Sequence, residues 1–398
     1  MTWKKWLMWV SITVLMVLGL TSCGLPRTTG KALIVWHTWS EAEAPVLEQV
    51  LADFQRLHPD IRVSVERKAY TTALDELAVA SRAGLGPDIL IGLESVYAHI
   101  LYQDGSTADL RDLAVDWTRF DAGTLQSINR DNGVRVGVPL NGYVNVLFYN
   151  PSLVKEPPRT LAELVAMSDQ GTRVGIPTTF FASYWGITAL GGSLFDGDAL
   201  STGAEESLAA WLAWLVAFQR TSGAVLSPDM RGLVDGFERG DVAVLMGNSL
   251  ELASLTARMG SDGVAVATLP EFPRAHPFSN VEVMVMNSAS VQKEAAALLI
   301  DFLTNETQQR KLARSTSGRA PINRHVGRLN SVLYPHVSAI LQQNRAAIVP
   351  TTAQDQIINR LIVLADPIYQ QVLEGLLSPE EGAHRIVTAF RAEEGAPQ

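Results

Sequence analysis

Apolar and polar positions follow two regular spacings along most of the chain. Short apolar or alternating runs predict strands at 32–36, 61–65 and 89–91, and apolar residues at helical spacing predict helices at 43–58 and around 74–78. Pro59 ends the first of these helices, and Gly84 lies near the end of the second. The order strand, helix, strand, helix, strand predicts a mainly parallel sheet with helices on both faces.

The same alternation continues to the end of the chain, with no internal repeat. We expect further strands at 134–139, 144–149, 242–246, 264–269 and 281–286, and further helices at 160–167, 205–220, 293–304, 307–314, 356–376 and 380–390. Asn141 and Gly142 lie between two of these strands, where such a pair is typical of a turn. The expected fold class is therefore α/β.

Residues 1–22 have the pattern of a signal peptide. Two lysines precede an apolar run at 6–20, which is short for a membrane span of about 20 residues but fits a secretory leader. The run leads into Leu-Thr-Ser-Cys, which ends at Cys23 and resembles a bacterial lipobox, where the cysteine is lipidated and becomes the new N-terminus. We expect a lipid on Cys23 and a tether at 23–30, and an uncleaved signal anchor is the alternative.

Composition narrows the classes of function. A chain of 398 residues suggests about two domains and is long enough to bury a large core. Its net charge of −9 argues against a nucleic-acid partner, which would require a basic face. A single cysteine excludes an intramolecular disulfide and any cysteine-clustered zinc or iron–sulfur site.

Motifs for catalysis are nearly absent. The sequence has no phosphate-binding loop, no dinucleotide-binding glycine motif and no HExxH, and its seven histidines lack metal-ligand spacing. A glycosidase needs two facing carboxylates, for which Glu94, Glu251 and Glu282 are candidates on spacing alone. We therefore predict no catalytic residue, no cofactor and no metal.

Six stretches of the chain together resemble a known family. They are 33–36 with the helix end at 54–61, 86–90, 137–140 leading to 147–150, 158–164, 237–244, and 295–303 followed by 318–321. In this order, after a lipobox, they resemble the extracellular solute-binding proteins of bacterial ABC importers, in the carbohydrate-binding group that includes maltose-binding protein. The sequence departs from the family at Ser279-Asn280, where two glycines are common.

The resemblance implies a two-lobed periplasmic-binding-protein fold, in which each lobe is a mainly parallel sheet flanked by helices and the ligand cleft lies between them. It assigns 31–143 and 282–325 to the N-terminal lobe, 144–281 and 326–392 to the C-terminal lobe, and 393–398 to a tail. The chain would cross between lobes near 141–145, near 278–281 and after Pro321. Ligands of open α/β sheets bind beyond the carboxyl ends of the strands, and hinge closure would enclose them here.

The resemblance also implies a set of residues that line the cleft. In the first lobe and at the crossing these are His37, Thr38, Trp39, Ser40, Glu94, Asn141 and Tyr143, and beyond it they are Phe181, Tyr184, Trp185, Asn248, Ser249 and Arg319. Aromatic rings would pack on the apolar faces of a sugar, and the polar groups would bind its hydroxyls.

Several of these residues have a structural alternative. Trp39 and the Tyr184-Trp185 pair can instead pack inside the lobes, and Glu94 can be an acid at a helix N-terminus. Asn141 can be a turn residue, and Arg319 can bridge the lobes or cap a helix. The sequence leaves these alternatives open.

The resemblance implies a lipid-anchored carbohydrate receptor that delivers a mono- to oligosaccharide, with a disaccharide favoured, to an ABC permease. We expect a monomer without cofactor or nucleic-acid partner, at the outer face of the cytoplasmic membrane or in the periplasm. Three alternatives remain. They are the same scaffold binding a non-sugar solute such as a polyamine, a secreted glycosidase, and a structural or signalling lipoprotein.

Overall fold

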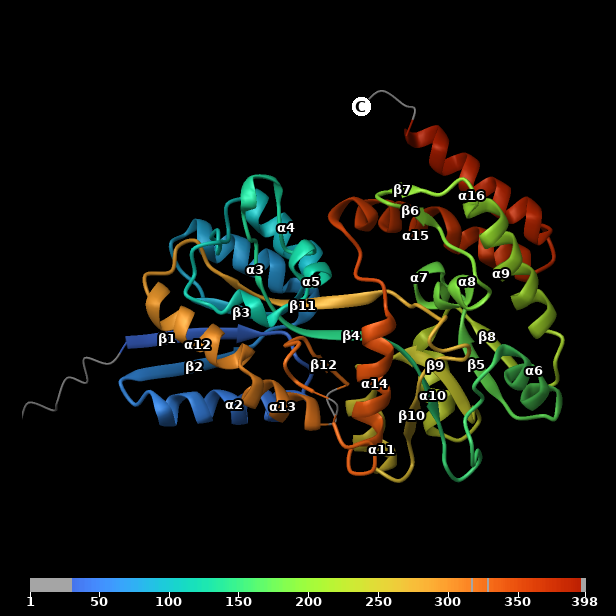
Figure 1. Cartoon of the computed structure of the whole chain (residues 1–398), viewed down its shortest axis with the longest axis horizontal. Coiled ribbons are helices and arrows are strands. Elements are labelled where there is room, and N and C mark those ends of the chain that lie inside the picture. The colour runs from blue at the N-terminus through green and yellow to red at the C-terminus, as the bar shows by residue number, and fades with distance from the viewer. Residues whose placement is uncertain (1–30, 316–317, 328, 395–398) are drawn as a thin grey trace, which may run out of the picture.

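The computed structural model describes residues 31–394 except 316–317 and 328, and forms two lobes (Figure 1). The leader and Cys23 lie outside the described residues. The first lobe contains strands β1 (Lys31–His37), β2 (Ile61–Arg67), β3 (Ile89–Glu94) and β11 (Ser279–Met286). Strands β2, β1 and β3 pair in parallel, and β11 pairs with β3 in the antiparallel sense.

The second lobe repeats this plan. It contains β5 (Val174–Pro177), β8 (Ala224–Ser227), β9 (Val244–Asn248) and β10 (Ala265–Ala267), with a separate hairpin of β6 (Phe195–Asp196) and β7 (Ala199–Leu200). Strand β5 pairs in parallel with both β8 and β9. Each lobe thus has three parallel strands joined to one or more antiparallel neighbours.

One long strand, β4 (Val138–Tyr149), joins the two sheets. Its first half, 138–144, pairs with β11, and its second half, 145–149, pairs with β9. The short strand β12 (Ala320–Pro321) pairs with Gly142 and Asn141 of β4. The chain therefore passes between the lobes along adjacent hydrogen-bonded strands, where a small rotation can change the angle between the lobes.

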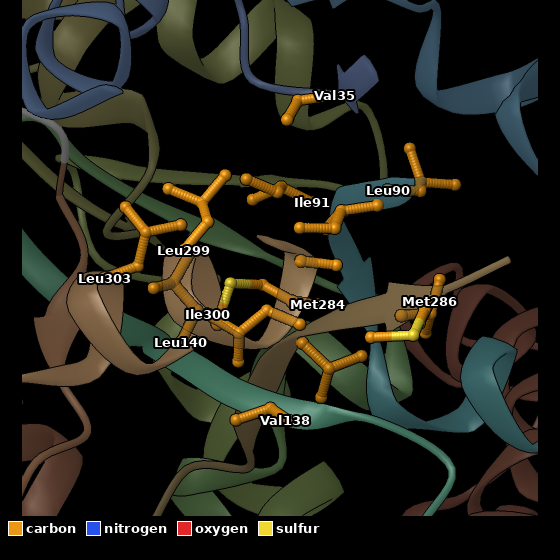
Figure 2. Close-up of a cluster of buried hydrophobic side chains, with 14 of the residues drawn as sticks. Val35, Leu90, Ile91, Val138, Leu140, Met284, Met286, Leu299, Ile300 and Leu303 are labelled. Atoms are coloured by element: carbon orange, nitrogen blue, oxygen red, sulfur yellow. The ribbon is translucent and has the colours of Figure 1, made fainter. Parts of the chain in front are cut away.

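Helices on both faces enclose the core of the first lobe. They include α2 (Ala44–Leu57), α3 (Tyr70–Arg82), α4 (Ser95–Gln103), α5 (Ala122–Gln126), α12 (Lys293–Thr304) and α13 (Glu306–Arg314). Leu90, Ile91 and Met284 of the sheet lie with Leu299 and Ile300 of α12 in one buried cluster (Figure 2). The residues of this cluster come from 33–140 and from 281–322, so two separate stretches of the chain build this lobe.

The second lobe has an apolar cluster on each face of its sheet. Its helices include α6 (Leu161–Asp169), α7 (Phe180–Ser183), α8 (Trp185–Ala189), α9 (Ala204–Phe218), α10 (Met230–Glu238), α11 (Glu251–Met259), α14 (Pro335–Ala346), α15 (Thr352–Leu373) and α16 (Pro379–Glu394). Leu147 of β4 packs toward α9, α15 and α16, whereas Val146 and Phe148 pack toward α10 and α11. This alternation follows the two-residue period of a strand.

Helix α14 packs against the strands that cross between the lobes. It contacts β4, β10 and β12, and in Figure 1 it lies over the junction of the lobes. A Cβ on Gly142 of β4 would lie 2.8 Å from the side-chain oxygen of Asn344, so glycine permits this close approach. The Ser279 hydroxyl donates to the same Asn344 oxygen at 2.8 Å, which ties β11 to the helix.

The structure corrects several expectations about elements. Residues 138–149 form one continuous strand, which excludes the alternative of Asn141 as a turn residue, because Asn141 and Gly142 are paired with β11 and β12. Helices α4, α10, α11 and α14 and strands β5 and β8 were not predicted. Helix α16 extends to Glu394, two residues into the expected tail. In the described part of the chain, no helix has both the length and the apolar character needed to cross a bilayer.

Candidate functional site

A cavity of about 680 Å³ lies between the lobes. One wall comes from α4 and from residues 126–130 of the first lobe, and the other comes from the tip of the β6–β7 hairpin and the first turns of α15. Its lining includes the amides of Gln103, Gln126, Asn129, Gln356 and Asn359, together with His99, Arg130, Asp198 and Asp355. This volume falls within the range of small-molecule sites, about 300–1,000 Å³.

A narrower pocket of about 30 Å³ continues from the cavity toward the crossing strands. Val96 and Asp355 line both spaces, so the two adjoin. Phe181, Phe278 and residues 279–281 of β11 form its inner wall. Among the described residues that line this pocket, Glu94 and Asp355 are the charged ones.

Glu94 lies at the carboxyl end of β3, immediately before α4. Tyr70 donates from its hydroxyl to Oε2 at 2.7 Å, and the hydroxyl of Tyr143 on β4 donates to Oε1. Burial, followed by the charge of Glu94, raises the pKa of the Tyr143 hydroxyl well above its ordinary value, so this group stays a donor. The sequence prediction of Glu94 and Tyr143 at the cleft thus corresponds to one hydrogen-bonded group at its inner end.

Asp355 was missed by the sequence analysis. It lies in the first turn of α15, whose N-terminus is closed by a capping box between Thr351 and Gln354. Burial, followed by the charge of Glu94, raises the pKa of Asp355 to about 7. The pattern Thr-x-x-Gln at 351–354, before an apolar helix, is the sequence signal that marks this helix start.

Of the predicted aromatic residues, only Phe181 lines the inner pocket. Its half-buried ring stacks on Phe278, with ring centroids 5.4 Å apart. Tyr184 stacks on the other side of Phe278 at 3.9 Å and is fully buried. Trp185 is also fully buried, against Trp211 of α9, so the structure gives Tyr184 and Trp185 a place in the core of the second lobe.

Three other predicted ligand contacts meet in a buried polar network outside the cavity. Glu282 of β11 accepts hydrogen bonds from Trp39 Nε1 at 2.7 Å, Asn141 Nδ2 at 3.1 Å and Arg319 Nε at 2.8 Å. Arg319 also pairs with Glu43 and lies 4.0 Å from the centre of the Trp39 ring. The network joins the loop between β1 and α2 to β4, β11 and the residue before β12, so these side chains connect the crossing strands.

The remaining predicted residues of the first lobe surround this network. His37 is buried, and burial followed by the cations Arg67 and Arg319 lowers its pKa to about 4. Thr38 donates to the carbonyl of Gly92, and exposed Ser40 donates to Glu43. These contacts hold the loop after β1 and do not line the cavity between the lobes.

The predicted residues Asn248 and Ser249 shape the turn between β9 and α11. The Asn248 side chain accepts from the backbone of Leu250 at 2.9 Å, and Ser249 accepts from the backbone of Val144 at 3.3 Å. Neither residue lines the cavity. The structure therefore brings Glu94, Tyr143 and Phe181 together at the cleft and gives the other predicted residues packing or turn contacts.

The arrangement suits binding of a polar solute more clearly than catalysis. Glu282 is 2% exposed and its oxygens are held by the network, and Glu251 is the first residue of α11. Neither acid lines the cavity or shares the inner pocket with Glu94. Within the residues that the structure describes, no group of three or more His, Cys, Asp or Glu side chains could hold a metal ion.

Comparisons with known proteins agree with this geometry. Residues 49–334 match the sequence profile of a family described as bacterial extracellular solute-binding protein. The galactooligosaccharide-binding protein of Bacillus subtilis (strain 168) is 28% identical over 193 residues, which cover 44% of this chain and 43% of that protein. The maltodextrin-binding protein MdxE of the same organism is 21% identical over 317 residues, covering 73% and 74%.

Solved structures share the fold. The GacH receptor of Streptomyces glaucescens GLA.O superposes with a TM-score of 0.75 at 18% identity, covering 91% of this chain and 98% of that one. The maltose-maltodextrin binding protein of Alicyclobacillus acidocaldarius gives a TM-score of 0.72 at 22% identity, covering 91% and 100%. These neighbours confirm the two-lobed α/β fold expected from the sequence.

Proposed function

Because the chain belongs to the family of bacterial extracellular solute-binding proteins, we propose that it captures a saccharide for an ABC importer. The observation that supports this most is the cavity between the lobes, whose walls supply five side-chain amides and two carboxylates. Each amide offers both donors and acceptors, which matches the hydroxyls of a sugar. Relatives named for binding galactooligosaccharide and maltodextrin support the same class of ligand.

Capture would follow from closure of the lobes about the β4 and β11 strands. Amides of α4 and residues 126–129 would bind one side of the sugar, and Gln356 and Asn359 of α15 would bind the other. Phe181, which stacks on Phe278, would offer an apolar face to a pyranose ring. A ligand that contacts both walls binds the closed arrangement better than the open one, which is what shifts the equilibrium.

The rest of the proposal concerns the cell. Lipid on Cys23 would hold a monomer at the outer face of the cytoplasmic membrane or in the periplasm, where it would deliver a mono- to oligosaccharide, with a disaccharide favoured, to the permease. The lipobox-like sequence before Cys23 supports the anchor.

The test is a titration of the purified protein with maltose, maltotriose, a galactooligosaccharide mixture and, as a non-sugar competitor, spermidine. We expect a saccharide to bind and F181A to weaken it roughly tenfold, the effect of losing one aromatic contact. Y334A is the matched control, because Tyr334 is also a half-buried aromatic residue but packs against Arg314 away from the cavity. Binding of spermidine but of no saccharide would refute the proposal.

A further inference from the structure

The inner pocket brings carboxylates from the two lobes together. Glu94 belongs to the first lobe, at the end of β3, and Asp355 belongs to the second, in the first turn of α15. Both line the same narrow pocket of about 30 Å³, which adjoins the cavity. Any rotation that parts the lobes must also part these side chains.

In the described part of the chain, the carboxylate of Glu94 has hydrogen-bond donors but no cation within ion-pair distance. Its two oxygens accept from the hydroxyls of Tyr70 and Tyr143. Burial and the charge of Glu94 raise the pKa of both hydroxyls, so they donate without carrying charge. The negative charge of this carboxylate therefore acts on whatever faces it across the pocket.

Asp355 faces that charge without a partner. Among the described residues its carboxylate makes no hydrogen bond or ion pair, and its backbone N–H donates to the carbonyl of Thr351. The next cation on α15, Arg360, donates to the carbonyl of Phe390 and lies over that ring. The proton taken up at this pocket should therefore reside on Asp355.

Other charged groups surround the two carboxylates at a greater remove. The wider cavity adds His99 from α4, Arg130 from the loop before β4, and Asp198 from the β6–β7 hairpin. His99 donates from Nε2 to the carbonyl of Ser127 and burial lowers its pKa, while Asp198 accepts from the hydroxyl of Thr351. Burial, followed by Glu94, is what raises the pKa of Asp355 to about 7.

We propose that closure of the lobes on a ligand takes up one proton at the Glu94–Asp355 pair, so that capture is favoured by acidic surroundings. The inference rests on the proposed function, since it concerns the same cleft. In the open arrangement, Asp355 is hydrated and far from Glu94, and it is ionised at neutral pH. In the closed arrangement, the solvent proton on the Asp355 carboxyl removes the repulsion between the lobes and leaves a hydroxyl donor beside the ligand.

The expected effect can be calculated from the two states of Asp355. With a pKa of about 7 when closed and an ordinary value of about 3.9 when open, affinity should rise about 30-fold from about pH 8 to about pH 5.5. The direction follows because the closed state holds the extra proton. D355N, which cannot ionise, should abolish this dependence.

The experiment is a calorimetric titration of maltotriose into the wild type, D355N and D198N at these pH values, in buffers of different ionisation enthalpy. We expect wild type and D198N to take up a proton on binding and D355N to take up none. D198N is the matched control because Asp198 lines the same cavity but is bonded to Thr351. E94Q should reduce the proton uptake, since it removes the facing charge.

A second arm needs no ligand. Because the raised pKa of Asp355 belongs to the closed arrangement, lowering the pH from about 8 to about 5 should shift the ligand-free wild type toward closure. Its radius of gyration, measured by small-angle X-ray scattering, should therefore be smaller at about pH 5 than at about pH 8, whereas that of D355N should not change.

The outcomes separate the two proposals. Saccharide binding that is independent of pH, or a D355N variant that keeps the wild-type pH dependence, overturns the inference and leaves the proposed function standing. If no saccharide in the panel binds, the proposed function fails. The scattering comparison then decides the inference: a radius of gyration of the wild type that depends on pH no more than that of D355N overturns it.

Discussion

Replacing Arg319 with methionine would leave two buried carboxylates without the cation between them. The side chains of Arg319, Glu43 and Glu282 are 5%, 5% and 2% exposed, so water cannot take over the role of the guanidinium. Breaking a buried ion pair by removing one partner costs about 3–5 kcal/mol. Glu282 keeps its bonds from Trp39 and Asn141, which places the expected loss near the lower end of that range.

The assay is thermal unfolding of R319M beside R258M. A loss of about 3 kcal/mol corresponds to a fall in melting temperature of about 10 °C for lobes of this size. Arg258 pairs with Glu238 at the surface, so its loss should leave the melting temperature within error. The tryptophan emission of R319M should also change, because the guanidinium lies 4.0 Å from the Trp39 ring.

Two results would refute this reasoning. One is an R319M protein that melts no lower than R258M, which would mean that the network does not hold the crossing strands. The other concerns R319M/E282Q, which removes one of the stranded charges and should recover part of the lost stability. If the double variant were less stable than R319M by the full cost of a second independent substitution, the two side chains would not be coupled.

Three further predictions concern packing and charge. W185A should lower the free energy of unfolding by about 3–5 kcal/mol, because the fully buried ring packs on Trp211, and urea titration measures this. G142A should cost about 1–3 kcal/mol in the same assay, since its Cβ would press on the Asn344 amide, and G142A/N344A should recover most of it. Because folding lowers the pKa of His37 from 6.5 to about 4, its contribution to stability is present above about pH 6.5 and lost as pH falls toward 4; H37N should flatten that part of the pH–stability curve.

Each of these has a contrary result. Stability of W185A close to wild type would mean that the indole is not part of the core. If N344A does not recover the stability lost in G142A, the added Cβ does not clash with the Asn344 side chain. A pH–stability curve of H37N that matches the wild type would assign the acid sensitivity to other groups.

The fold could be predicted from the sequence where a single period dominates. The helix 44–57 and the strand 89–94 follow from their apolar spacing, and the structure has them within a few residues of the prediction. Helix α14 was not predicted because one of its buried residues is Gln343, which interrupts the apolar pattern. The Gln343 side chain donates to the carbonyl of Ala275 and accepts from the backbone N–H of Leu269. The continuous strand at Asn141-Gly142 was not predicted, because pairing with β11 and β12 overrides the turn preference of these two residues.

The cleft could be predicted only in part. Glu94 was predicted because acidic and polar residues after a strand lie at the edge of the sheet where ligands bind. Trp39 follows a strand in the same way and Arg319 precedes a short one, yet both meet Glu282. No local pattern distinguishes a ligand contact from a buried partner 243 or 37 residues away. Asp355 comes from the far end of the chain, and its place opposite Glu94 depends on how the second lobe packs against the first.

A crystal structure of the protein with the tightest-binding saccharide tests the central claim most directly. The account predicts sugar density between α4 and α15, with hydroxyls bonded to amides of both lobes and one ring beside Phe181. Saccharide bound at another surface, or the cavity occupied by an amine or a peptide in place of the sugar, would contradict it.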